Sequence, residues 1–550
     1  MACPRRLWSL LLVVLLAIGT SASLYSRRHR SAATADEEFA TMMIPHHQRA
    51  IDMALDELRH GRNEQFRRLA QEIIVTQQQE IAVLRSAYRA GRVAVGGEST
   101  PNWRAPGHDR VYAAEQFSNT VSVTDPADNR LLGVIRLGDP LPANLSPLYR
   151  GQLLVHGMGF SPDHRTLAVV SIGSNSVTFI ETKTNAVQHV TYVGRSPHEA
   201  FFTPDGREVW VTVRGENYVS VLDATTFAEK LRIPVPNGPG MQIFSPDGKY
   251  GYVCSSFTPE TVVISVADHQ IVGRVEQPSP FCPNIAASPD GEQVWFTLKD
   301  VGKVRVFSGR PPFQVLRTID TGPITNHVNF ARNSRGTFAY VSVGGLNQVQ
   351  VFRLDDFSKV ATIPVGNLPH GVWPSGDGNR VYVGLENDDQ LIAIDALANK
   401  VIASIPIGQA PQAIAYVPDA VPDGDGLTGL QPLDGAGNVV HLVLGSAGGK
   451  VATSVSLFDQ GLVQMLQAAV VGLKPSESYV LGFARRADGS GPIEALAAFK
   501  TNPAGSAVVN TTGPIRQLVR NETSANRRYL VILSGTPTQL GALAQIQLAR

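Results

Sequence analysis

Apolar and polar residues alternate in short runs through the middle of the chain, and these runs return with a fixed period. Turns with the sequence Pro-Asp-Gly separate them at residues 204–206, 246–248 and 289–291. Alternation is typical of β-strands with one buried face, and Pro-Asp-Gly is typical of tight turns. One period contains four runs, at residues 198–203, 208–213, 218–223 and 230–235. Each period therefore predicts four antiparallel strands.

The period is clearest at the residue that begins the first strand of each repeat. These seven opening residues, 42 or 43 positions apart, are His156, His198, Met241, Asn284, His327, His370 and Gln412. Four-stranded repeats of this length are typical of β-propellers. The last repeat has only its first strand, at 412–417, and three strands within 110–137 complement it. We therefore predict a seven-bladed propeller over residues 110–417, with a seventh blade made from both ends of the array.

The strands of the repeats read Val-Trp-Val-Thr-Val at 209–213 and Val-Ser-Val-Leu-Asp at 219–223. They resemble the YVTN-type seven-bladed propellers of bacterial periplasmic and surface proteins. The resemblance implies the fold and no particular activity, because propellers carry many unrelated functions.

Residues 1–35 have the pattern of a targeting segment. Arg5 and Arg6 precede an apolar run at residues 7–18, which is short for a membrane span and typical of a secretory signal. An uncleaved anchor in the inner membrane is the alternative, since three further arginines follow the run. In either case we expect the remainder to lie in the periplasm or outside the cell.

Residues 36–92 are predicted to form a hairpin of two helices, the first ending at Gly61 and the second covering residues 64–90. The first helix carries three methionines and two histidines at helical spacing, namely Met42, Met43, His46, His47 and Met53. Thioether and imidazole donors together favour copper or silver ions. We therefore predict a metal site on this helix. The alternative is that the methionines fill the core and the histidines face solvent.

The runs Phe39–Ala54 and Leu69–Ile81 resemble the family called domain of unknown function 305. Some members of that family are linked to copper or silver handling. The resemblance implies that the helical hairpin binds copper or silver, and copper is the cofactor that we expect.

Four of the seven opening residues are histidines: His156, His198, His327 and His370. The innermost strands of a propeller surround its central channel, so these side chains are expected near one mouth of it. They are candidate metal ligands, and occupancy is expected to fall as the pH drops through about 6.5, the ordinary histidine pKa. The alternative is that they are polar lining of a wet channel.

Cys254 and Cys282 are predicted to lie at one face of adjacent blades. In an oxidising compartment they are expected to form a disulfide. A copper-thiolate pair is the alternative use.

The remaining segments complete a multidomain, mainly β chain. Residues 93–109 and 418–436 are rich in glycine and proline and are predicted to be linkers. Residues 437–550 contain eight alternating runs and are predicted to form a β-sandwich. The chain has 48 basic and 47 acidic residues, so no nucleic-acid partner is expected.

These observations favour an exported, non-enzymatic metal-handling protein, with copper bound by the helical segment and the propeller acting as a platform. Its expected partners are the metal ion and another periplasmic protein, with the membrane involved only through an N-terminal anchor. Two alternatives stay open. One is a propeller enzyme, a lactonase-like hydrolase or a metal-dependent redox enzyme, with its site at the channel mouth. The other is a surface propeller that binds another protein.

Overall fold

The computed structural model describes most of the chain from Ala32 onward. The described residues are 32–61, 63, 66, 70, 73, 107–137, 153–433, 439–446, 452–459, 464–513, 515–520 and 526–548. They belong to two compact units, Met1–Arg92 and Val93–Arg550. Almost all of the predicted targeting segment 1–35 and of the linker 93–109 lies outside the described residues. No helix among the described residues is long and apolar enough to cross a membrane.

The first unit contains helix α1 (Ala32–His60), which begins four residues before the predicted start. It ends where predicted, and the Gly61 N–H donates to the Glu57 carbonyl at 2.8 Å. Most of the predicted second helix lies outside the described residues. Phe66, Ala70 and Ile73, which are described, are helical.

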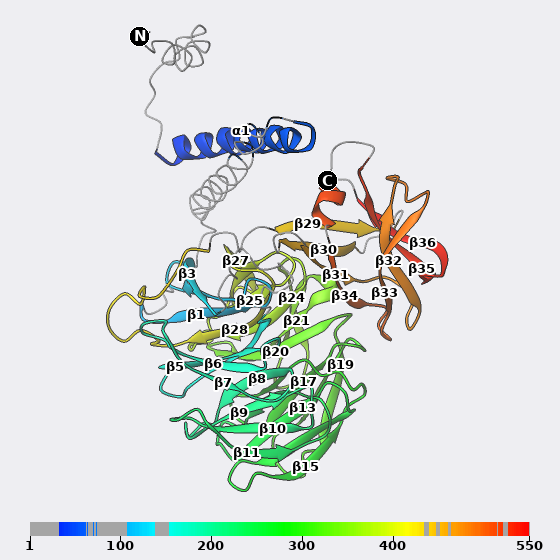
Figure 1. Cartoon of the computed structure of the whole chain (residues 1–550). Coiled ribbons are helices and arrows are strands. Elements are labelled where there is room, and N and C mark those ends of the chain that lie inside the picture. Colours follow the sequence, from blue (N-terminus) through cyan, green and yellow to red (C-terminus); the bar gives the residue numbers. More distant parts are fainter. Residues whose placement is uncertain are drawn as a thin grey trace, which may run out of the picture. The chain divides into compact units, whose positions relative to one another are not determined.

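Residues 107–137 and 153–417 form the predicted seven-bladed propeller, with seven four-stranded antiparallel sheets (Figure 1). The innermost strands are β4 (Val155–Phe160), β8 (Pro197–Phe202), β12 (Pro239–Phe244), β16 (Ile285–Ala287), β20 (Thr325–Asn333), β24 (Pro369–Pro374) and β28 (Pro411–Val417). The second strands are β5 (Thr166–Ser171), β9 (Glu208–Val213), β13 (Tyr250–Ser255), β17 (Gln293–Leu298), β21 (Gly336–Val343), β25 (Arg380–Leu385) and β1 (Arg110–Glu115). The third strands are β6 (Ser176–Glu181), β10 (Tyr218–Asp223), β14 (Glu260–Ser265), β18 (Lys303–Ser308), β22 (Gln348–Arg353), β26 (Gln390–Asp395) and β2 (Thr120–Asp125). The outer strands are β7 (Val187–Tyr192), β11 (Glu229–Pro234), β15 (Gln270–Glu276), β19 (Val315–Asp320), β23 (Lys359–Pro364), β27 (Lys400–Pro406) and β3 (Arg130–Arg136).

The seventh blade is closed by both ends of the array, as predicted. Its sheet has the order β28-β1-β2-β3, and Val111 of β1 pairs with Tyr416 of β28. Closure of this kind removes the two free edges that an open array would expose.

Aromatic residues at one register position of the second strands fill the spaces between blades. They are fully buried, and they are Tyr112, Trp210, Tyr252, Trp295, Tyr340 and Tyr382. A disulfide adds a covalent link between adjacent blades. Cys254 on β13 is bonded to Cys282, just before β16, with a Cα–Cα distance of 6.0 Å. The predicted disulfide is confirmed.

The C-terminal strands form one eight-stranded sheet instead of the two sheets of a sandwich. Its order is β33-β32-β35-β36-β29-β30-β31-β34. The strands are β29 (Val439–Gly445), β30 (Ala452–Asp459), β31 (Gln464–Val470), β32 (Ser478–Ala484), β33 (Ile493–Lys500), β34 (Ala507–Gly513), β35 (Tyr529–Thr536) and β36 (Gln539–Gln547), with a short helix α3 (Ile515–Arg520) before β35. The edge strands β33 and β34 contact each other, so the sheet nearly closes on itself. The alternating pattern predicts only that each strand buries one face. A two-sheet sandwich and a single nearly closed sheet both meet this condition.

Residues 418–433, most of the predicted linker, lie against the propeller. Gln431 and Val134 of β3 exchange two backbone hydrogen bonds of 2.8 and 2.9 Å. The Asn185 side-chain amide donates to the carbonyls of Gly426 and Thr428, both at 2.9 Å. These contacts fix the segment that leads to the C-terminal sheet.

Candidate functional site

The four opening histidines come together at one level of the channel. The ring centroids of His156 and His198 are 4.3 Å apart, and those of His327 and His370 are 4.5 Å apart. The two pairs meet across the channel, since His156 and His370 are 6.1 Å apart. The four residues are 3 to 7% exposed. The structure therefore brings the four predicted channel histidines together in a buried cluster of imidazoles.

The local backbone directs these side chains toward the channel. Strand pairing is irregular at all four, between Val155 and Met158, Pro197 and Ala200, Thr325 and Val328, and Pro369 and Val372. Shortly before each histidine, a residue other than glycine has a positive φ: Leu154 (53°), Ser196 (51°), Ile324 (56°) and Leu368 (56°). Irregular pairing changes the direction of a side chain, and this left-handed conformation is costly for a β-branched residue. The combination of irregular pairing and a left-handed residue is thus repeated in four blades.

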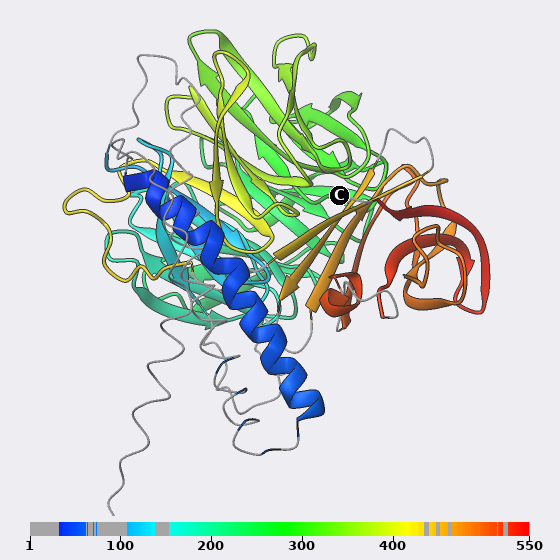
Figure 2. The same ribbon diagram turned by 90° about the horizontal axis from the view of Figure 1, so that it is seen from above.

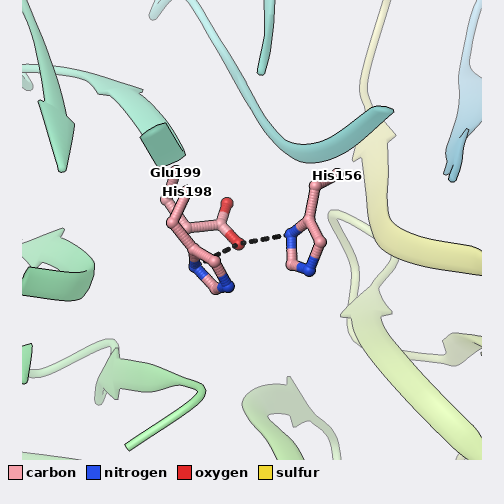
Figure 3. Close-up of side chains that lie close together, drawn as sticks. All are labelled: His156, His198 and Glu199. Atoms are coloured by element: carbon pink, nitrogen blue, oxygen red, sulfur yellow. Dashed lines mark ion pairs between the residues drawn. The ribbon is translucent and has the colours of Figure 1, made fainter. Parts of the chain in front are cut away.

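Glu199 completes a three-residue group with the first histidine pair. Its Oε1 lies 3.9 Å from His156 Nδ1 and 3.8 Å from His198 Nδ1. Figure 3 shows the Glu199 carboxyl group between the two rings, with His156 approaching from the neighbouring blade. These three residues can each offer a ligand atom, with the atoms all within 4.8 Å of one another.

Three atoms of this group have no hydrogen-bond partner among the described residues although they are buried. They are His156 Nδ1, His198 Nδ1 and Glu199 Oε1. Buried polar atoms normally have partners, so a convergent unpaired set indicates a bound ion or ligand. Two metal bonds of about 2.0–2.1 Å at a tetrahedral angle separate donor atoms by roughly 3.3 Å. The two Glu199–imidazole separations of 3.9 and 3.8 Å would each shorten by about half an ångström to hold such an ion.

The protonation states also suit metal binding. Burial, together with nearby positive charge, holds the pKa of His156, His198 and His327 well below the ordinary value. These imidazoles are therefore neutral at pH 7, as metal ligation requires. Burial also raises the pKa of Glu199 to about 8, against the opposing effect of a hydrogen bond from the Met158 backbone. Glu199 therefore carries a proton at neutral pH that a metal ion must displace.

A second carboxylate, Glu386, accompanies the second histidine pair. Its Oε1 lies 2.9 Å from His370 Nδ1. Burial alone would raise the pKa of Glu386, but the His370 ring beside it, followed by the charge of Lys299, holds this pKa below the usual range. Glu386 is therefore ionised, in contrast to Glu199.

The sequence interpretation missed both carboxylates, although the repeat register contains a signal for each. Glu199 directly follows an opening residue, where the other repeats have Gly157, Gln242, Ile285, Val328, Gly371 and Ala413. Glu386 directly follows a second strand, the position that Arg214 and Lys299 occupy in their own blades. Aligning the repeats at every position would have marked these charged residues.

A cavity of about 130 Å³ adjoins the cluster. Its polar lining includes Glu199, Asn284 and His327, and its apolar lining includes Met158, Phe201 and Trp373. The rings of Phe201 and Trp373 stack with centroids 6.5 Å apart. The site therefore has room beside it for a small, largely apolar molecule.

The five candidate ligands of α1 are accessible to different degrees. Met42 and Met53 are 68 and 69% exposed, His46 is exposed, and Met43 and His47 are half-buried. The rings of His46 and His47 lie edge to face with centroids 5.6 Å apart. Their role as metal ligands stays a prediction.

Comparison with known proteins gives one family match and several similar folds. Residues 18–88 match the family described as Domain of unknown function (DUF305). No match was found among curated proteins.

The similar solved structures overlap with about half of this chain. Hydrazine synthase of Kuenenia stuttgartiensis has 21% identity and a TM-score of 0.44, covering 52% of this chain and 93% of that one. A functionally unknown protein of Desulfotomaculum acetoxidans has 16% identity and a TM-score of 0.48, covering 56% and 98%. The periplasmic gluconolactonase PpgL of Pseudomonas aeruginosa has 21% identity and a TM-score of 0.44, covering 56% and 99%. Likeness at this level carries no argument about activity.

Proposed function

We propose that this chain is an exported metal-binding protein whose propeller channel holds a transition-metal ion. The observation that carries the proposal is the convergence of His156, His198 and Glu199, with three buried atoms that lack partners among the described residues. His327 and His370 supply two further imidazoles beside them. Export is supported by the signal-like pattern of residues 1–35 and by the disulfide, since disulfides persist in oxidising compartments.

The donor set narrows the choice of metal. Neutral imidazoles with one carboxylate favour zinc, copper(II) or another late transition metal over magnesium and calcium. The methionines and histidines of α1 favour copper(I) or silver(I). Copper is the metal that suits both donor sets, and we propose it as the physiological ligand.

Metal titration of the mature protein tests the proposal. Wild-type protein should bind one equivalent of Cu(II) or Zn(II) that is lost in the double variant His198→Ala/Glu199→Gln. His189→Ala is the matched control, because His189 lies exposed on the outer strand β7. Equal binding by wild type and double variant would contradict the channel site.

An enzyme is the second candidate, and the cavity beside the cluster favours it. Catalytic zinc sites commonly have three protein ligands and one open position, where a bound water has a pKa near 7. A three-ligand group next to a cavity of about 130 Å³ matches this arrangement. Turnover of lactones or of redox substrates, lost in His198→Ala/Glu199→Gln, would establish this function. If the protein binds neither metal nor substrate, the remaining alternative is a propeller that binds another protein.

A further inference from the structure

The C-terminal sheet reaches the histidine end of the channel through Gln467 on β31. The Gln467 Nε2 donates to Glu386 Oε2 at 2.8 Å and to Asn387 Oδ1 at 3.3 Å. Asn387 also donates to Ser454 Oγ on β30 at 2.9 Å. Gln467, Glu386 and Asn387 are 1 to 4% exposed, so this contact is buried.

The two oxygens of Glu386 are shared between the C-terminal sheet and the histidine cluster. Oε2 accepts the hydrogen bond from Gln467, and Oε1 lies 2.9 Å from His370 Nδ1. A carboxylate that faces Nδ1 keeps a proton on that nitrogen, which leaves Nε2 as the nitrogen with a free lone pair. Histidines that bind metals commonly have such a carboxylate partner, which sets the tautomer and the orientation of the ring.

We infer that Gln467 is a positioning residue for His370, acting through Glu386, and that the C-terminal sheet is therefore part of the channel metal site. The inference rests on the proposed function, since it takes His370 as one of the metal ligands. It also assigns a role to a domain in which the sequence shows no chemistry.

Apolar packing holds the C-terminal sheet against the residues that direct the histidines. Ala469 and Val471 pack with Ile324 and Leu368. Phe458 packs with Ala410. Both views show the orange strands beside the yellow and green blades (Figure 1; Figure 2).

Three of these propeller residues have the left-handed conformation just before an innermost strand: Ile324 at 56°, Leu368 at 56° and Ala410 at 54°. This conformation is costly, above all for the β-branched Ile324. The packing of the C-terminal sheet thus stabilises the backbone that orients His327 and His370.

Loss of the Gln467 amide should change the state of Glu386. Its Oε2 would lose a donor in a buried place, which is unfavourable. The titratable groups that face Glu386 are His370 and Lys299. The carboxylate would be free to turn toward Lys299, and the Oε1 that lies 2.9 Å from His370 Nδ1 would move away from that nitrogen. Changes to such supporting partners typically weaken metal binding 10- to 100-fold.

Competition titration of the full mature chain with Zn(II) and with Cu(II) is the first test. Gln467→Leu should weaken affinity about 10- to 100-fold. Gln545→Leu is the matched control, because Gln545 is a buried glutamine of the same sheet whose partners, Thr453 and Val471, belong to the C-terminal domain. The control should retain wild-type affinity even if it unfolds more easily. Unchanged affinity in Gln467→Leu would overturn the inference.

Gln467→Asn provides a second variant if Gln467→Leu does not fold. The shorter side chain keeps an amide in the buried contact but withdraws it from Glu386 Oε2, which lies 2.8 Å from the Gln467 nitrogen in wild type. Its metal affinity should fall by about 10- to 100-fold, as in Gln467→Leu. Wild-type affinity in Gln467→Asn would contradict the positioning role.

Nitrogen NMR of His370 in the metal-free protein separates failure of the inference from failure of the proposed function. Wild-type protein should show one tautomer, with the proton on Nδ1, and Gln467→Leu should show a mixture. If wild type binds no metal, the proposed function fails, while this pair of spectra still decides the positioning role. A single Nδ1–H tautomer in both proteins would overturn it.

Discussion

His156 and His370 lie edge to face across the channel, with ring centroids 6.1 Å apart and an angle of 84° between the rings. They come from the first and sixth complete repeats of the array, and only the closure of the seventh blade brings them together. The separation fits a shared ion or ligand, because imidazoles at this distance can approach one centre through small side-chain movements.

Metal affinity should rise with pH up to about 8. The sequence alone predicted a loss of occupancy below pH 6.5, but the lowered pKa of three histidines moves their protonation to more acidic conditions. Glu199, with a pKa raised to about 8, becomes the group that competes with the metal at neutral pH. Each pH unit below about 8 should cost up to tenfold in affinity from this proton alone.

Glu199→Gln should remove this dependence between about pH 6.5 and 8 and should bind metal more weakly at pH 8. Competition titrations at several pH values measure both effects. If metal affinity depends on pH with the same slope in both proteins, the metal does not displace a proton from Glu199.

Glu199 should reduce the stability of the metal-free protein as the pH rises, and Glu199→Gln should remove this contribution. The pKa of Glu199 is raised to about 8 in the folded protein, above its ordinary value of 4.5. The folded state therefore holds this proton more tightly than the unfolded state between those values, and the stabilisation is lost as the pH rises through them.

Thermal unfolding of wild type and Glu199→Gln at pH 5 and at pH 8 measures the difference. One pKa unit corresponds to about 1.4 kcal/mol, so a relative gain for the variant on the order of 1–4 kcal/mol is expected at pH 8. Glu115, whose pKa burial raises to about 7, and the three histidines with a lowered pKa are present in both proteins, so their contributions cancel in the difference. A difference that is the same at both pH values would contradict the raised pKa of Glu199.

Removal of the disulfide should destabilise the propeller without abolishing metal binding. Cys254 and Cys282 are 28 residues apart, and closing a loop of this size contributes about 3.6 kcal/mol in the chain-entropy model. Urea unfolding of the Cys254→Ala/Cys282→Ala protein measures the loss. Peptide mapping without reduction provides the control, and two free thiols in the wild-type protein would refute the bond.

Replacement of the α1 donors should remove soft-metal binding while sparing the channel. In the full chain, Met42, Met43, His46 and His47 changed together to Ala should lose Ag(I) and Cu(I) binding, because thioether and imidazole donors favour these ions. Zn(II) binding at the channel should be retained. Asp52→Ala is a control on the exposed surface of the same helix. Unchanged Ag(I) affinity in the quadruple variant would exclude the α1 site.

The sequence predicted the propeller well because its strands, its repeat and its closure depend on local signals. Strand positions follow from alternation, the repeat from turns such as Asp247-Gly248, and the seventh blade from two complementary fragments. The topology of the C-terminal sheet could not be predicted, because alternation does not distinguish one curled sheet from two packed ones.

The site was predicted in part for a similar reason. The repeat period placed the four histidines at one register position, and the structure brings them together. Glu386 was missed because it lies in a turn after a second strand, whereas the repeat was compared only at the residues that open the innermost strands. Gln467 could not be predicted, since its role depends on how a separate domain packs against the channel.

The most direct test of the channel site is an anomalous-diffraction structure of the mature protein soaked with Zn(II) and, separately, with Cu(II). One peak is expected about 2.0–2.1 Å from nitrogens of His156 and His198, with Glu199 moved to a similar distance. A channel that shows only water at hydrogen-bond distances from these side chains, at saturating metal, would contradict the channel site.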